Sequence, residues 1–323
     1  MSSGHAQRIA GDDSGLFLVP AGTSAAHEAV LAWWLIGGAT LAFVVVMVLL
    51  AWALPGRGTR AGRSGWWLVG GGLAVPALAL AGLQWGNLRD LAATAAAPPR
   101  DALLVTVHGR LWWWELHIHG DDGGTPLVLA NELHLPVGRP VRLALASDDV
   151  IHSLWLPALA GKVDLVPGRI NHLLVEATRP GRWAAPCAEF CGTAHTAMVL
   201  RTVAQPADEF DRWLADQRAD AREPTTPLEL AGRRLFIEQR CTTCHTIRGV
   251  AAATLTGAHG GPDLTHLGSR EHLGAGSLRN DADGLRRWIT GVQHVKPGAR
   301  MPSYAQLDAA TLDALVAYLG SLR

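Results

Sequence analysis

Two short clusters of cysteine, histidine and methionine hold the residues whose chemistry the sequence indicates most clearly. The chain has four cysteines, which fall into two pairs, one within residues 187–198 and the other within residues 241–245. Thiolate, thioether and imidazole ligands favour transition metals over hard cations such as calcium and magnesium. The placement of these few residues therefore predicts metal chemistry.

Residues 241–245 read Cys-Thr-Thr-Cys-His, which is a CxxCH motif. In such a motif the thiols of Cys241 and Cys244 attach covalently to haem, and His245 binds the iron. Met301 is the predicted second axial ligand, and a methionine–histidine pair raises the reduction potential. A redox CxxC pair or half of a zinc site stays open as an alternative. Four histidines also stay open as competing iron ligands: His259, His266, His272 and His294.

Residues 187–198 place two thiols, one imidazole and one thioether within twelve residues: Cys187, Cys191, His195 and Met198. A further imidazole, His152, lies upstream in Asp149-Val-Ile-His152. This donor set suits copper. A disulfide between Cys187 and Cys191 in an oxidising compartment is the alternative. It would leave the two histidines and the methionine without a role.

Two long uncharged stretches predict membrane attachment. Residues 29–56 and 64–88 contain 28 and 25 residues without a formal charge, and a helix needs roughly 20 apolar residues to cross a bilayer. The loop between them, residues 57–63, carries three arginines, which place it in the cytoplasm. Residues 1–28 are then extracytoplasmic. Because no apolar stretch precedes residue 29, we expect no cleavable signal peptide and a first span that acts as its own export signal.

The rest of the chain divides into two domains joined by a linker. Residues 101–215 contain short β-prone runs separated by glycine and proline turn signals, which predict a small sandwich or barrel. Residues 216–227 are polar, include two prolines and are typical of a linker. Residues 228–323 show helical periodicity, and Asp308 is a predicted cap of the last helix.

Composition and charge narrow the possible function classes. Hydrophobic residues make up 49% and charged residues 17% of the chain, which argues against a disordered or highly charged protein. The 28 basic and 28 acidic residues balance, so no overall basic field indicates nucleic-acid binding. Residues 101–215 nevertheless carry a net charge of −4, and residues 229–323 carry +3. These opposite signs predict that the α domain docks on the β domain.

The α domain resembles a class I cytochrome c across about its last 95 residues. The resemblance rests on residues 241–245, on Gly-Pro-Asp-Leu at 261–264, on Met-Pro at 301–302, and on an aromatic residue in the final helix. It implies one covalently bound haem c. The attachment residues would be Cys241 and Cys244, and the axial iron ligands His245 and Met301.

Residues 152 and 187–198 resemble the ligand set of the binuclear CuA centre in subunit II of haem–copper oxidases. Residues 161–171 match the pattern of that subunit, and the resemblance covers both predicted spans and the β domain. It implies a two-helix transmembrane hairpin, an all-β cupredoxin-like barrel and then an all-α cytochrome c domain. Two coppers would be held by six residues: His152, Cys187, Glu189 (through its backbone carbonyl), Cys191, His195 and Met198.

The same resemblance assigns roles to two further groups. The Glu189 carboxylate is expected to help hold a magnesium ion at the junction with subunit I. Trp112 is the first of three consecutive tryptophans and is the expected electron entry point above CuA. On a strand, Trp112 and Trp114 would face one side of the sheet and Trp113 the other.

The resemblance implies the electron-input subunit of a proton-translocating cytochrome c oxidase in a bacterial-type inner membrane, with both soluble domains on the periplasmic side. Electrons would pass from a cytochrome c donor through haem c and CuA to the haem–copper centre of subunit I, which reduces oxygen to water. Subunit III is a further expected partner. Two alternatives stay open: the electron-input subunit of a CuA-containing nitric oxide reductase, and a membrane-anchored electron shuttle or copper-binding protein without a catalytic partner.

The second predicted span departs from the family pattern. Many members carry a glutamate several residues before the proline of this span, at the mouth of a proton channel. Here the residues from 66 to 75 are aromatic, aliphatic or glycine, with no carboxylate before Pro76. We therefore expect protons to enter through another group, for example on subunit I, or the complex to belong to a divergent branch.

Overall fold

The computed structural model describes residues 19–54, 64–94, 99, 101–120 and 123–323. They divide into two compact units: residues 30–100, and residues 1–29 together with 101–323. We call the first the helical hairpin and the second the main unit. The predicted cytoplasmic loop 57–63 and residues 1–18 of the predicted N-terminal segment lie outside the described residues.

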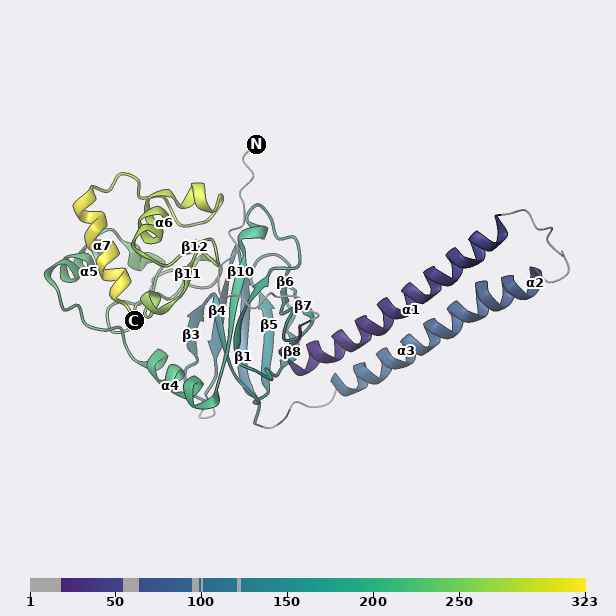
Figure 1. The fold of residues 1–323 in the computed structure, drawn as a ribbon. Helices are drawn as coiled ribbons and strands as arrows, with labels where there is room; N and C mark the ends of the chain where they lie inside the picture. The colour runs from purple at the N-terminus through teal and green to yellow at the C-terminus, as the bar shows by residue number, and fades with distance from the viewer. Residues whose placement is uncertain (1–18, 55–63, 95–98, 100, 121–122) are drawn as a thin grey trace. The chain divides into compact units, whose positions relative to one another are not determined.

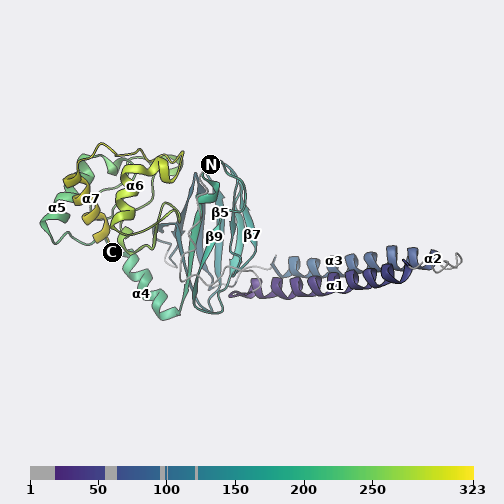
Figure 2. The same cartoon turned by 45° about the horizontal axis from the view of Figure 1, so that its top comes forward.

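The helical hairpin is built from two long apolar helices. The first is α1 (Thr23–Ala53), and the second runs through α2 (Ser64–Trp66), a π-helical segment (Trp67–Ala74) and α3 (Val75–Thr94). They lie side by side in opposite directions (Figures 1 and 2). The π-helical segment includes three consecutive glycines and ends just before Pro76, whose ring and missing N–H disfavour regular α-helical bonding in the preceding turn.

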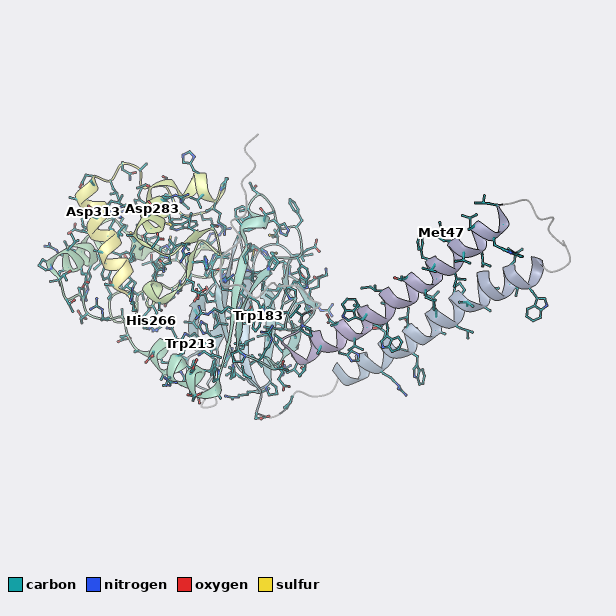
Figure 3. The ribbon with its side chains drawn as sticks, viewed as in Figure 1. Met47, Trp183, Trp213, His266, Asp283 and Asp313 are labelled. Atoms are coloured by element: carbon teal, nitrogen blue, oxygen red, sulfur yellow. The ribbon has the colours of Figure 1, made fainter. Side chains whose placement is uncertain are left out.

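Both helices have the length and composition of membrane spans. Thr23–Ala53 and Leu68–Arg89 qualify by length and hydropathy, and no residue of their most apolar windows is buried in the structure. Apolar side chains, Met47 among them, line α1 (Figure 3). Residues 29–53 of the first predicted span and residues 64–88 of the second lie on these helices, and α1 begins six residues before the predicted start of the first span. Residues 55 and 56 of the first predicted span lie outside the described residues.

The β domain is a two-sheet structure, as predicted. One sheet has the strand order β3-β2-β1-β5-β8 and the other β4-β10-β9, while β6 pairs with β7. The strands are β1 (Leu103–Arg110), β2 (Trp113–Ile118), β3 (Leu127–Ala130), β4 (Glu132–Pro136), β5 (Val141–Ser147), β6 (His152–Trp155), β7 (Lys162–Leu165), β8 (Asn171–Val175), β9 (Gly181–Pro186) and β10 (Val199–Gln205). Their inward side chains share one core, which contains the fully buried Trp114 and the 2%-exposed Trp183.

The prediction that all three tryptophans share a strand is wrong. Arg110 of β1 pairs with Trp113 of β2, so Leu111 and Trp112 form the two-residue turn between these strands. Trp113 and Trp114 lie on β2, and only Trp114 enters the core. The turn frees Trp112 from the sheet, and its indole can therefore reach a neighbouring loop.

The α domain is a small helical domain, also as predicted. Its helices are α5 (Pro227–Glu238), α6 (Ala282–Val295) and α7 (Ala309–Ser321), with a short pair of strands, β11 (His272–Leu273) and β12 (Leu278–Arg279). Asp308 caps α7 by accepting a hydrogen bond from the Thr311 amide at 2.9 Å, as predicted. At the other end of the domain, Thr226 and Glu229 form a capping box on α5.

The segment between the two domains is shorter than the predicted linker 216–227. Helix α4 (Ala207–Arg218) follows β10 and extends through the first three of these residues. Its amphipathic sequence packs Phe210 into the β-domain core, and this burial continues the helix past the point where polar residues predict a linker. Residues 219–226 then connect α4 to α5.

Close packing of α5 on α7 generates a stability prediction. A Cβ atom at Gly232 would lie 2.1 Å from the Ala314 carbonyl oxygen and 2.6 Å from the Tyr318 Cβ. We expect Gly232→Ala to lower the free energy of unfolding by about 1–3 kcal/mol, because overpacking forces the helices apart. Thermal unfolding of the purified chain measures the effect. In the control, Gly320→Ala on α7, the nearest atom would be Leu285 Cδ1 at 3.9 Å, so equal losses in the two variants would contradict the prediction.

Candidate functional site

The loop of residues 187–198 connects two neighbouring antiparallel strands. The register pairs Val199 of β10 with Pro186 of β9, so the two ends of the loop lie opposite each other. The Cys187 amide donates to the Met198 carbonyl at 3.0 Å and closes the loop at its base. A short 3-10 helix (His195–Ala197) precedes Met198. We call residues 187–198 the copper loop, after the ion for which its ligand types are suited.

The structure brings the sulfur and imidazole groups of the copper loop together. The Cys187 and Cys191 sulfurs lie 3.9 Å apart, and both cysteines are free and buried. Cys191 Sγ lies 3.6 Å from His195 Nδ1 and 3.9 Å from Met198 Sδ. A disulfide has an S–S distance of about 2.05 Å, so the structure shows two separate thiols beside an imidazole and a thioether.

His152 reaches the same cluster from another strand. It begins β6, which bridges to the copper loop through Leu154 and Cys187. One of its ring nitrogens and the two cysteine sulfurs all lie within 4.8 Å of one another. Among the described residues, His152 Nδ1 is buried without a hydrogen-bond partner. A buried imidazole nitrogen beside two thiols fits a metal ion, which would satisfy it.

Asp149 holds the other side of the His152 ring, and sequence reasoning assigned it no role. Its Oδ1 lies 2.8 Å from His152 Nε2, while its Oδ2 accepts from the Leu111 amide at 2.8 Å. Burial opposes ionisation of Asp149, but the hydrogen bonds from His152 and from two backbone amides lower its pKa. Metal-binding histidines commonly donate their second nitrogen to a carboxylate. The spacing Asp149-x-x-His152 was the available signal.

The pKa values of the two thiols are shifted in opposite directions. A hydrogen bond from the Cys191 thiol lowers the pKa of Cys187 to about 3, although burial opposes this shift. The pKa of Cys191 is raised, because it donates to Cys187 and because burial and the adjacent thiolate disfavour a second charge. Cations between the sulfurs would remove this repulsion. The donor set therefore fits a copper centre that takes both cysteines as thiolates.

The backbone carbonyl of Glu189 lies in the cluster, whereas its side-chain carboxylate lies at the surface. Its backbone oxygen lies 3.3 Å from Cys187 Sγ, inside the cluster. Its side chain is exposed, and the neighbouring Phe190 is 76% exposed. The carbonyl is thus placed with the predicted copper ligands, while the carboxylate is available to groups outside the described chain.

A cavity of about 480 Å³ lies in the main unit beside the CxxCH motif, within the usual range of about 300–1,000 Å³ for ligand sites. Cys241, Cys244, His245 and Met301 all line it. Most of the lining is apolar, and three arginines also contribute: Arg240, Arg270 and Arg300. Apolar walls with a few cationic groups fit a haem, whose ring is apolar and whose carboxylates are anionic.

His245 is oriented by its backbone surroundings. Its Nδ1 lies 2.8 Å from the Pro262 carbonyl oxygen, which leaves Nε2 as the nitrogen able to bind iron. Met301 belongs to a loop that Gln293 ties down by donating to the Ala299 and Met301 carbonyls at 2.7 and 2.9 Å. Among the competing histidines, His259 and His272 line the same cavity. His266 instead lies 3.0 Å from the Ala219 carbonyl oxygen, and His294 is exposed.

Trp112 contacts both candidate sites. Its Nε1 donates to the Cys191 carbonyl at 2.8 Å, and the same residue lines the cavity that contains Cys241, Cys244 and Met301. The structure therefore places an aromatic side chain between the copper loop and the haem-sized cavity.

Comparisons with known families identify two domains in this chain. Residues 120–204 match the family described as cytochrome c oxidase subunit II, periplasmic domain, and residues 230–323 match the family described as cytochrome c. The first match contains the copper loop and His152, and the second contains the CxxCH motif and Met301. Two parts of the chain are thus similar to known families, one to the periplasmic domain of oxidase subunit II and the other to cytochrome c, as the sequence resemblance predicted.

Named relatives extend the similarity to about two thirds of the chain. It is 38% identical over 223 residues to cytochrome c oxidase subunit 2 of Alkalihalophilus pseudofirmus, and 30% identical over 233 residues to that of Bacillus sp. strain PS3. Each alignment covers 69% of this chain, and the chain spans 62% and 63% of these relatives. The solved periplasmic domain of oxidase subunit II from Bradyrhizobium japonicum matches 37% of this chain and 96% of its own, at 27% identity and a TM-score of 0.35.

The contact between Asp149 and His152 generates a prediction about metal affinity. We expect Asp149→Asn to weaken copper binding by about 10–100-fold, because the imidazole loses the carboxylate that orients it. Titration of the metal-free chain with copper, followed by absorption, measures the affinity. Asp148→Asn is the matched control, since Asp148 pairs with Arg110. Equal affinities in the wild-type and Asp149→Asn chains would contradict the prediction.

The position of Met301 generates a prediction about reduction potential. Methionine opposite histidine raises the potential of a haem. We expect Met301→His to lower the haem potential by at least about 0.1 V, within the roughly 0.8 V range that axial ligands set. Spectroelectrochemical titration of the purified chain measures it. An unchanged potential would show that another residue, with His259 and His272 the first to examine, binds the iron in the wild-type chain.

Proposed function

We propose that this chain is the electron-input subunit of a membrane-bound cytochrome c oxidase. Electrons enter the cytochrome domain from a cytochrome c donor, pass through haem c and CuA, and leave for the haem–copper centre of subunit I, which reduces oxygen to water. The observation that carries the proposal is the position of Trp112, which lines the haem-sized cavity and donates to the carbonyl of a copper-loop cysteine.

The residues of this chain have defined tasks in that function. Cys241 and Cys244 attach the haem, and His245 and Met301 bind its iron. The six residues predicted for CuA hold two coppers: His152, Cys187, the Glu189 carbonyl, Cys191, His195 and Met198. Haem and copper held by these residues would supply one-electron redox chemistry.

The groups around the ligands hold the geometry and polarity that electron transfer needs. Asp149 fixes the His152 ring, and the Pro262 carbonyl fixes the His245 ring. Hydrogen bonds of the ring nitrogens stop the imidazoles from rotating. Burial of both cysteines excludes water from the thiolates, which limits solvent reorganisation around the charge. The chain thus supplies rigid ligands in dry surroundings.

The exposed side chains at one end of the copper loop support the proposal that this surface binds another subunit of the membrane complex. Phe190 is 76% exposed, and Trp155, which follows the Leu154 bridge to Cys187, is 37% exposed. Exposed apolar side chains that gather in one patch mark interaction sites. The neighbouring Glu189 carboxylate is a suitable ligand for magnesium shared with subunit I. We propose subunit I as the partner on this surface and subunit III as a further member of the complex.

The two apolar helices support anchorage in a bacterial-type inner membrane, with both soluble domains on the periplasmic side. The arginines of residues 57–63 favour that orientation. Proton translocation belongs to the complex in this proposal. A CuA-containing nitric oxide reductase would use the same electron-input groups, so the identity of the gas is the point to test.

Gas uptake by the intact purified complex tests the proposal. The complex receives reduced cytochrome c and is offered oxygen or nitric oxide separately. Cyanide-sensitive oxygen uptake is the expected result. Nitric oxide uptake without oxygen uptake would replace the oxidase with the reductase. Purification without a haem-containing catalytic subunit, and with neither gas consumed, would favour an anchored electron shuttle.

Removal of the Trp112 ring generates a kinetic prediction. We expect Trp112→Ala to slow electron transfer from haem c to CuA by about tenfold or more, equivalent to roughly 1.4 kcal/mol of activation free energy. Rapid-mixing absorption spectroscopy with reduced donor measures the rate. Trp112→Phe keeps an aromatic ring and loses the indole N–H, so it separates the ring from its hydrogen bond to Cys191. Wild-type rates in a fully loaded Trp112→Ala complex would exclude this route.

A further inference from the structure

Lys296 joins the α domain to the copper loop through an unusual set of contacts. It follows the last residue of α6, and its side chain is buried, with 3% of the residue exposed. The ammonium donates to three backbone carbonyls: Trp112 at 2.6 Å, Ala197 at 2.7 Å and Gly274 at 2.8 Å. Trp112 and Ala197 belong to the β domain, while Gly274 belongs to the α domain.

Two of these three carbonyls belong to elements that the proposed electron path uses. Ala197 lies in the copper loop between His195 and Met198, and Trp112 is the aromatic residue between the two candidate sites. Lys296 also begins the loop that leads to Met301. A single ammonium group therefore connects the copper loop, the bridging tryptophan and the base of the loop that carries the predicted iron ligand.

The convergence of three carbonyls on one point favours a lysine at this site. An ammonium carries three N–H donors on one nitrogen, so it can satisfy three carbonyls that converge on one point, whereas a guanidinium spreads its donors over a plane. The whole chain contains 26 arginines and two lysines, Lys162 and Lys296. Burial lowers the pKa of Lys296 to about 7. The three carbonyl dipoles act in the opposite direction, because they stabilise the charged form.

Further contacts hold the same face of the α domain. A Cβ atom at Gly298 would lie 3.1 Å from the Trp112 ring, and one at Gly192 would lie 3.2 Å from it. The Trp112 ring is thus closely packed against both the loop that begins at Lys296 and the copper loop. Val199, which follows the copper loop, donates its amide to the Ala275 carbonyl at 3.0 Å.

We propose that Lys296 is a positioning residue that fixes the cytochrome domain on the copper loop and thereby sets the rate of electron transfer between haem c and CuA. This inference rests on the proposed function, because it assumes that both cofactors are bound. Lys296 is not itself a predicted cofactor ligand, although it lines the haem-sized cavity beside Trp112. It acts through the carbonyls of Trp112 and Ala197.

Kinetics of three variants in the purified complex test the role of the ammonium. Lys296→Met keeps most of the side-chain length without the charge, and Lys296→Arg keeps the charge without three donors on one nitrogen. One charged hydrogen bond is typically equivalent to about a tenfold change in an equilibrium constant or more. We therefore expect about tenfold slower haem-to-CuA transfer in Lys296→Met and an intermediate or equal loss in Lys296→Arg.

Arg287→Met is the matched control for charge. Arg287 lies on α6, and its side chain is 60% exposed, so this variant removes the same charge from the same domain without touching the copper loop. It should transfer electrons at the wild-type rate. If Lys296→Met, with both cofactors present by absorption and electron paramagnetic resonance, matches the wild-type rate, the proposal is wrong. An equal slowing in Arg287→Met would also overturn it in favour of a general charge effect.

Amine labelling of the wild-type complex provides a second readout that needs no variant. An amine-specific acylating reagent modifies lysines, and mass spectrometry measures the labelling rate of each one against the same residue in the unfolded chain. We expect Lys296 to be protected by more than about tenfold, because labelling requires local opening. Labelling of Lys296 at the unfolded rate would overturn the proposal.

The two readouts separate the failure of this inference from failure of the proposed function. A wild-type chain that binds neither haem nor copper contradicts the proposed function, whereas its labelling still reports whether Lys296 is held in the docked position. A chain with both cofactors, a protected Lys296 and an unchanged Lys296→Met rate contradicts the positioning role alone.

Discussion

Two buried thiols held close together impose the strictest geometric requirement on the β domain. The Cys187 and Cys191 sulfurs lie 3.9 Å apart, and a second negative charge at that distance in a buried site is strongly disfavoured without cations. Holding both groups there requires a rigid frame. The β9–β10 register closes the copper loop at its base, and β6 fixes the ring of His152 against it. The two-sheet core is what keeps these strands from moving apart.

The α domain must also hold a candidate site in place, and it has fewer and shorter elements with which to do so. Three helices and short connecting segments form most of the wall of a cavity of about 480 Å³, which Trp112 of the β domain also lines, and a large cavity removes packing contacts from a small domain. The parts of the domain that do not line the cavity are therefore densely packed. Gly232 allows α5 to approach the backbone of α7, and Phe236 and Tyr318 meet edge to face with ring centroids 6.1 Å apart. In the proposed function, haem would complete this core as well as supply the redox centre.

How much the sequence predicts depends on the range of the interaction. The two cysteine motifs are local, so residue type and spacing were enough to group their members. The two-sheet and helical domains followed from periodicity and turn signals. The position of Trp112 did not, because the Arg110–Trp113 pairing turns two residues of an apparent strand into a hairpin loop. Asp149 was visible only as a neighbour of His152, since its task depends on where the ring points.

Contacts between the two domains were the least predictable feature from the sequence. Net charges of −4 and +3 predicted docking by opposite sign, yet Glu271 of the α domain pairs with Arg182 and Arg201 of the β domain, against that net polarity. The buried contact of Lys296 involves backbone carbonyls, which carry no sequence signature.

The difference between net charge and specific contacts matters for electron transfer between two domains of one chain. A tether alone raises the effective concentration of the domain to roughly the millimolar range, and net charge steers encounters without fixing one orientation. Electron transfer between the two proposed cofactors would need one particular orientation of the domains that hold them. A desolvated ammonium with three converging carbonyls satisfies its donors in one geometry, since rotation of either domain would leave a buried charge unpaired. In the proposed function, the covalent link between the domains would bring them close together, and the packing around Trp112 and Lys296 would fix their orientation.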